Sequence, residues 1–215
     1  MTAFDYTIIR NKKRKRVVIS ITPENTVKVS APNWIAKSRI IEFVEEKSDW
    51  IQKHLKKNKL KKPKPSFTGN HTDEFYYLGS PITLKKILEI ANIKQDLPTE
   101  KIKTKLLKWY RQLATEIIED RVLIWSKHIP KKPKIIRFKT MRSRWGSCSS
   151  LDNLNFNWKL IMAPLDVIDY VVIHELCHLI QHNHSPKFWA LVESIMPDYK
   201  SHKKWLGEHG YLLTI

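Results

Sequence analysis

The chain has 215 residues, of which 42% are hydrophobic and 28% are charged, and these proportions indicate a folded globular protein rather than a disordered one. No apolar run approaches the ~20 residues needed to span a bilayer, and two cysteines, Cys148 and Cys177, are too few for a disulfide framework. Residues 1–10 lack an apolar signal core, so we expect a cytoplasmic protein with reduced thiols and no membrane association.

The net charge of +18 is carried entirely by the first two-thirds of the chain. Residues 1–140 contain 32 Lys and Arg against 14 Asp and Glu, whereas residues 141–215 contain 7 against 7. Such asymmetry suggests that the basic region meets a polyanion, such as DNA, a nucleotide or an acidic polypeptide. A solvated, lysine-rich surface explains the same charges equally well.

The first part of the chain is predicted to form a basic, β-rich lobe over residues 1–97. Runs of β-branched residues predict strands at residues 6–9, 17–21 and 27–30, joined as an antiparallel meander. A helix is predicted from about residue 34 to residue 58, followed by a lysine-dense connector that ends in prolines. A hairpin is expected over residues 75–90, turning at Gly79-Ser80-Pro81.

Residues 98–215 are predicted to form the catalytic region. A long helix is expected from residue 98 to about residue 127, then strands at residues 134–141 and 154–161, with a polar turn at residues 142–153 between them. Three helices are predicted to follow, at about residues 167–181, 186–195 and 198–209. Strands followed by helices indicate an α+β fold in which one helix packs on a small antiparallel sheet.

The motif H-E-x-x-H occurs at residues 174–178, inside the first of these three helices. Residues four apart in a helix project from one face, so His174 and His178 can each direct a nitrogen at a single zinc ion about 2 Å away. Glu175 lies about 100° further round the helix. It is therefore free to act as general base, taking a proton from the water that the zinc activates.

Catalytic zinc usually has three protein ligands and one open position, so a third ligand is required. His184 is the preferred candidate, because its interval from His178 equals that of the longer H-E-x-x-H-x-x-G-x-x-H pattern. The glycine of that pattern is replaced by Gln181, and we expect Asn183 to turn the chain through the left-handed conformation instead. Glu193 on the following helix is a competing third ligand.

A hydrolase of this kind also needs a donor for the developing oxyanion. Tyr199, His202 and Arg144 are the candidates, and the sequence does not separate them.

Several segments resemble the YgjP-like metallopeptidase family. They are residues 142–149 (RSRWGSCS), 154–160 (LNFNWKL), 167–172, the His motif, 183–185, 188–189 and 197–199. The chain also looks like a relative of the SprT-type zincin proteases. The resemblance implies a zincin-like fold with an edge strand beside the metal, expected here at residues 154–160, along which a polypeptide substrate could lie. It further implies that the turn at residues 145–148 supports the site.

Three functions are consistent with the sequence. The leading hypothesis is a zinc-dependent metallopeptidase that hydrolyses peptide bonds, with DNA as a partner of the basic lobe by analogy with the SprT-type proteases. The second keeps the metal but makes the enzyme a nucleoside triphosphate pyrophosphatase or phosphohydrolase, in which lysines and arginines neutralise phosphates. The third is a nucleic-acid-binding protein with a structural metal, which the presence of Glu175 argues against.

Overall fold

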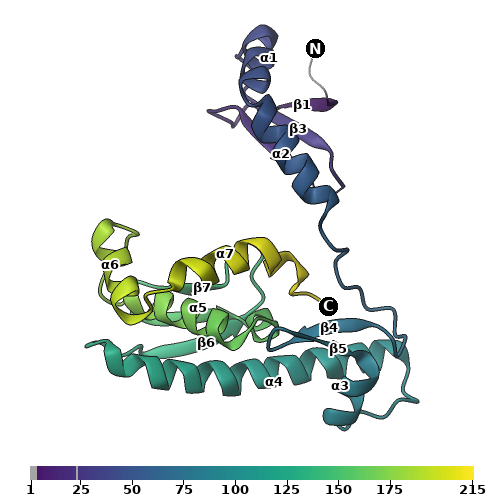
Figure 1. Ribbon diagram of the computed structural model, residues 1–215, viewed down its shortest axis with the longest axis vertical. Helices are drawn as coiled ribbons and strands as arrows, with labels where there is room; N and C mark the ends of the chain where they lie inside the picture. Colours follow the sequence, from purple (N-terminus) through teal and green to yellow (C-terminus); the bar gives the residue numbers. More distant parts are fainter. Residues whose placement is uncertain (1–3, 23) are drawn as a thin grey trace. The chain divides into compact units, whose positions relative to one another are not determined.

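The computed structural model describes residues 4–22 and 24–215 and divides into two compact units, Met1–Lys62 and Pro63–Ile215 (Figure 1). This division differs from the expected boundary between residues 97 and 98. Residues 63–97 join the second unit because Phe75, Leu84 and Ile87 are fully buried in the same core as the long helix that follows them. The basic lobe is therefore smaller than the sequence suggested.

The first unit contains a three-stranded sheet and two helices. Its strands are β1 (Tyr6–Arg10), β2 (Val18–Ile21) and β3 (Val27–Ala31), followed by α1 (Lys37–Glu46) and α2 (Ser48–Lys59). The strands are those predicted, but the single predicted helix is broken at Lys47, which caps α1. The core consists of Val27, Val29 and Ala31 of β3 together with Ile40, Val44 and Ile51 of the helices.

The predicted antiparallel meander is wrong. The sheet order is β1-β3-β2, with β1 parallel to β3 and β2 antiparallel to it. The reason lies in burial: every apolar residue of β3 is buried, whereas Ile9 of β1 and Val18 of β2 are exposed by 44% and 42%. The most apolar strand occupies the centre, and every residue of the basic connection at 11–16 is exposed.

The second unit is built on a long helix, α4 (Thr99–Trp125), whose bounds agree closely with the prediction. Ile102, Leu106, Tyr110, Ala114, Ile118 and Val122 form its buried stripe, at the spacing of one helix face. Before it come strands β4 (Glu74–Tyr77) and β5 (Ser80–Thr83) and helix α3 (Leu84–Ile90). The predicted hairpin is thus shorter than expected, because residues 84–90 are helical. No helix in the described ranges is both long enough and apolar enough to cross a membrane.

A second three-stranded sheet lies beside the predicted site helix. It comprises β6 (Ile135–Lys139), β7 (Gly146–Cys148) and β8 (Asn153–Asn157), in the order β6-β8-β7. β6 pairs parallel with β8, and β7 pairs antiparallel with it, so the predicted purely antiparallel sheet is corrected to a mixed one. The predicted edge strand is also wrong: β8 is central, and its residues Leu154, Phe156 and Asn157 are all buried. The edge strands are β6 and β7, and β7 is the one that packs against α5.

Three helices complete the second unit: α5 (Leu165–Cys177), α6 (Pro186–Ile195) and α7 (Tyr199–His209). A 3-10 segment, η2 (Trp158–Met162), links β8 to α5, and two others, η1 (Ser126–His128) and η3 (Gly210–Leu212), follow α4 and α7. α5 packs against α4, β7, α6 and α7, and is thus covered on several sides (Figure 1). The architecture is a mixed α/β fold with small sheets, as predicted in its broad class.

Candidate metal centre

Helix α5 carries His174 and Glu175 of the H-E-x-x-H motif, with His178 as its C-cap, and it is apolar almost all round. Its residues from Val167 to Ile173 are buried without exception, as expected for a helix in the core rather than at a surface. An ion pair fixes it to α4: Arg121 Nε and Nη2 donate to the two carboxylate oxygens of Asp169, at 2.5 and 2.6 Å. The motif histidines are therefore presented by a rigidly held element.

The chain turns back immediately after α5 and so brings His184 to the helix. α5 ends at Cys177, and the next turn tightens to i→i+3 bonds, from Leu179 N to Leu176 O and from Ile180 N to Cys177 O. Asn183 does not have a positive φ, so the expected left-handed turn is wrong. Instead the Asn183 side chain accepts a hydrogen bond from Ser185 N at 3.3 Å, which is an Asx turn.

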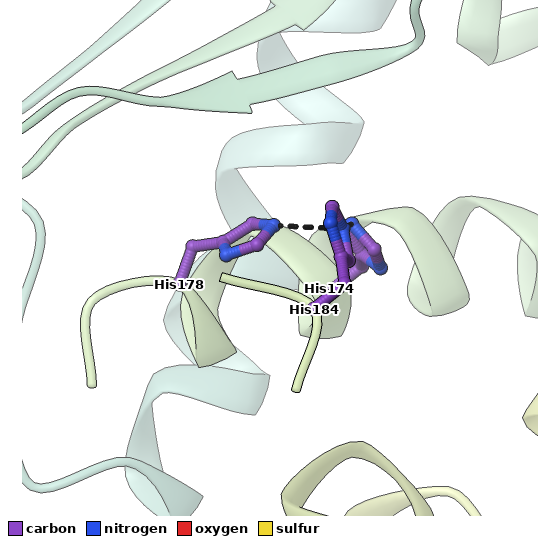
Figure 2. Close-up of side chains that lie close together, drawn as sticks. All are labelled: His174, His178 and His184. Carbon is purple, nitrogen blue, oxygen red and sulfur yellow. Dashed lines mark hydrogen bonds between the residues drawn. The ribbon is translucent and has the colours of Figure 1, made fainter. Parts of the chain in front are cut away.

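The imidazoles of His174, His178 and His184 point their Nε2 atoms at one another (Figure 2). His184 Nε2 lies 3.0 Å from His174 Nε2 and 3.2 Å from His178 Nε2. Three nitrogens bound to one ion at about 2.05 Å in tetrahedral geometry lie about 3.3 Å apart. The observed separations are therefore close to those that a single shared metal ion requires.

The protonation of these rings also suits a metal. Burial, aided by the neighbouring histidines and Lys203, lowers the pKa of His174 to about 3. Burial likewise lowers the pKa of His178, so both rings are neutral near pH 7. His178 Nδ1 lies 2.9 Å from the carbonyl of Gln181, and a proton shared there leaves Nε2 as the free lone pair. The three histidines are therefore suited to bind a metal cation through their imidazole nitrogens.

Glu175 projects beside this cluster and is nearly inaccessible, with 4% of its surface exposed. Its Oε2 is buried without a hydrogen-bond partner. Burial raises the pKa of Glu175 to about 8, and the nearby Arg144 opposes that rise. The side chain packs against Gly146 of β7, where a Cβ atom would lie 2.5 Å from Oε1. Only a glycine at 146 leaves room for the carboxylate in this position.

Comparison with known proteins identifies the family. The model of the YgjP-like metallopeptidase domain matches residues 15–209. The chain belongs to the YgjP-like family. Among solved structures, the metallopeptidase zymogen abylysin of Pyrococcus abyssi is similar over 42% of this chain and 93% of its own, at 19% identity and a TM-score of 0.39. No curated protein matches the chain significantly. Membership of a metallopeptidase family implies a hydrolase that uses a metal.

In this YgjP-like protein the three histidines and Glu175 line a cavity of about 440 Å³, which we call the metal-site cavity. Its wall on the sheet side is formed by residues 144–148, and Tyr170, Val171, His182 and Leu206 complete it. His182 thus faces the cavity but is not part of the histidine cluster. Glu193, the competing ligand, is an exposed residue that pairs with Lys200 at 2.9 Å, away from the cluster.

Of the three candidate oxyanion donors, only Arg144 lines the metal-site cavity. Tyr199 is buried, with its ring stacked on Trp189 at 5.3 Å between centroids, and Trp189 in turn stacks on His184. His202 is buried between two carboxylates, at 2.9 Å from Asp198 and 3.4 Å from Asp166. Tyr199 is therefore linked to His184 through Trp189, His202 joins α7 to the first turn of α5, and neither residue lines the cavity.

Two features of the cavity were not predicted. One is the conformation of Gly146, Ser147 and Cys148: the turn expected to support the site at residues 145–148 is largely strand β7, which forms the cavity wall itself. The other is Tyr170, whose ring meets His174 edge-on at 5.9 Å. Its position four residues before His174 on α5 was a signal that would have found it. Burial raises the pKa of the Cys148 thiol to about 11, so this side chain is a protonated thiol near pH 7.

Proposed function

We propose that this chain is a zinc-dependent metallopeptidase in which His174, His178 and His184 hold the metal and Glu175 is the general base. One observation carries the proposal. The Nε2 atom of His184 lies within 3.2 Å of the Nε2 atoms of His174 and His178, and Oε2 of Glu175 is buried beside them without a hydrogen-bond partner. A zincin-like arrangement, with the motif helix beneath an edge strand, is part of the same proposal.

Zinc is the metal that best suits these ligands. Three neutral imidazoles and no sulfur or carboxylate ligand correspond to a catalytic zinc site with one open position. Zinc held by these three histidines would lower the pKa of water toward ~7 and would polarise the carbonyl of the scissile bond. The cavity of about 440 Å³ beside the histidines leaves room for water and for a substrate carbonyl.

Glu175 performs the proton transfers in this scheme. A cation held by the adjacent histidines would favour the ionised form of Glu175 against the effect of burial. The carboxylate would then take the proton of the attacking water and deliver it to the nitrogen that leaves when the peptide bond breaks. Close packing against Gly146 holds the side chain in one position, which favours efficient proton transfer. We also propose that Arg144 donates to the developing oxyanion, because it is the one predicted donor that lines the cavity.

We propose that the backbone of the substrate binds along the free edge of strand β7. β7 pairs with β8 on one side only, and its residues form the cavity wall opposite α5. A polypeptide in extended conformation can pair with such an edge and bring a peptide carbonyl to the histidines.

The test compares the wild-type chain with Glu175→Gln and Glu193→Gln. All three proteins are expected to bind about one zinc ion per chain, and Glu175→Gln is expected to lose hydrolysis of unfolded protein. Glu193→Gln, which alters an exposed carboxylate outside the cavity, is the matched control and should remain active. Full activity of Glu175→Gln would refute the general-base assignment, and loss of zinc from Glu193→Gln would move a ligand to α6.

The same preparations test the alternatives. Nucleoside triphosphates are assayed in parallel, and unfolded protein is assayed with and without DNA. Hydrolysis of triphosphates without proteolysis would keep the metal site but replace the substrate class. Zinc binding with neither activity would favour a structural metal.

A further inference from the structure

A second cavity of about 390 Å³ adjoins the metal-site cavity in the same compact unit. The two cavities share Arg144, Trp145 and Leu206 as lining residues. The second cavity is lined by four cations, Lys64, Arg142, Arg144 and Lys159, and by no Asp or Glu. We call it the cationic cavity.

None of the four cations forms an ion pair in the described part of the chain, although Arg144 lies near enough to Glu175 to oppose the rise of its pKa. In residues 4–22 and 24–215, no carboxylate lies within ion-pair distance of any of them. Lys159 is half-buried, and its Nζ donates to the hydroxyl of Thr214 at 3.1 Å. Burial, together with the nearby Lys64, lowers the pKa of Lys159. Gathered like charges of this kind disfavour one another, and an anion placed among them relieves the repulsion.

Hydrogen bonds of a buried side chain hold the wall of the cationic cavity in place. Asn157, only 3% exposed, donates from Nδ2 to the carbonyls of Met141 at 3.0 Å and of Arg144 at 3.4 Å. Its Oδ1 accepts from the backbone N–H of Lys159 at 3.3 Å. One buried amide therefore fixes the segment that carries Arg142 and Arg144 against the segment that carries Lys159. Positions held in this way suit the recognition of a specific anionic group.

The cationic cavity is continuous with the proposed path of the substrate. Residues 141–145 line it, and residues 144–148, which include edge strand β7, line the metal-site cavity. A polypeptide paired with β7 therefore passes from one cavity toward the other, and a side chain near the scissile bond can enter the cationic cavity.

We propose that the cationic cavity is a substrate subsite that binds the carboxylate of a Glu or Asp side chain close to the scissile peptide bond. This inference rests on the proposed peptidase function. A polypeptide is favoured over a nucleotide because the family is a metallopeptidase family and the cavity adjoins the strand edge. Charge-assisted hydrogen bonds from Arg142 and Lys159 would hold the carboxylate.

The experiment separates binding from hydrolysis. Zinc-loaded Glu175→Gln protein is titrated with fluorescein-labelled peptides in which Glu, Gln or Lys occupies each position of an otherwise neutral sequence, and anisotropy is recorded. At one position we expect Glu to bind about tenfold more tightly than Gln, the effect of one charge-assisted hydrogen bond. The same ratio is then measured as kcat/KM with the Glu175-containing protein. If the protein binds the peptides but does not hydrolyse them, the proposed peptidase function is wrong. The anisotropy data would still show whether the cationic cavity prefers a carboxylate.

Substitutions in the cationic cavity test whether the preference for Glu arises there. Lys159→Met and Arg142→Gln are each expected to abolish the preference for Glu while leaving the affinity for the Gln peptide within about twofold. Lys127→Met removes an exposed lysine that lines neither cavity and should preserve the preference. Equal binding of Glu and Gln peptides at every position would overturn the proposal. A preference for Glu over Gln that persists in the Lys159→Met variant would also overturn it. So would displacement of the peptides by inorganic triphosphate if Glu and Gln peptides bind equally well.

Discussion

Gly146 offers a direct test of how the candidate site is assembled. It lies in strand β7 with Glu175 packed against it, and a Cβ atom there would be 2.5 Å from Oε1, 2.6 Å from Cγ and 2.7 Å from Cδ of Glu175. Ordinary contacts begin near 3.4 Å, so Gly146→Ala must displace the carboxylate by about 0.9 Å. The backbone at 146 is not in the left-handed region, and alanine therefore acts through sterics alone.

A displacement of this size is large for catalysis and modest for folding. Misplacement of a catalytic group by about 1 Å can lower kcat about 100-fold, and overpacking of this kind costs about 1–3 kcal/mol of stability. The zinc content should not change, because the atoms that the new Cβ meets first all belong to Glu175 rather than to a histidine. We therefore expect Gly146→Ala to be a folded, zinc-loaded protein with about 1% of the wild-type kcat.

The assay measures kcat and KM on an unfolded protein substrate, the zinc content, and the thermal unfolding temperature of the same samples. Gly207→Ala is the matched control, since a Cβ atom at residue 207 meets nothing within 4 Å, and it should retain full activity. Wild-type kcat in a folded Gly146→Ala protein would refute the view that this contact positions Glu175. Loss of zinc with loss of activity would show that the substitution disrupts the histidines instead.

Three further perturbations address the metal, the scaffold and the basic lobe. His184→Ala should weaken zinc binding more than about 100-fold, beyond the effect of losing a residue that merely supports a ligand, and unchanged zinc affinity in a chelator competition would exclude His184 as a ligand. Arg121→Met leaves Asp169 buried without its partner and should lower the free energy of unfolding by about 3 kcal/mol; a urea midpoint equal to that of wild type would contradict this. Neutralising the exposed residues 12–16 should weaken DNA binding. It should also reduce the slope of log K against log salt concentration by about one for each phosphate that is no longer neutralised. An unchanged slope would mean that the lobe binds no polyanion through this loop.

The parts of the site that are local in sequence were predictable. The spacing of His174 and His178 determines that both face one way on a helix, and the short interval to His184 allows the chain to return. The start of α6 was predicted because Pro186 occupies the first helical turn, where a missing N–H is tolerated. Each of these features depends on residues less than a dozen positions apart.

Features that depend on strand pairing were not predictable from the same signals. The runs at residues 6–9, 17–21 and 27–30 were identified as strands, but period-two patterns do not reveal which strand is central. Strand β7 has only three residues and contains a glycine and two small polar or thiol residues, so it was interpreted as part of a turn. Its conformation is set by pairing with β8, which is information that the segment itself does not contain.

The position of the Glu175 carboxylate consequently depends on the glycine at position 146. The histidine cluster is specified by residues 174–184, but the position of the carboxylate depends on a residue of another element that is distant in the chain. A chain that retained the H-E-x-x-H motif with a larger side chain at position 146 would keep three converging imidazoles and lose the space for the carboxylate that we propose as the base. Such a chain is expected to bind zinc without hydrolysing peptides, so the motif alone is a better predictor of metal binding than of catalysis.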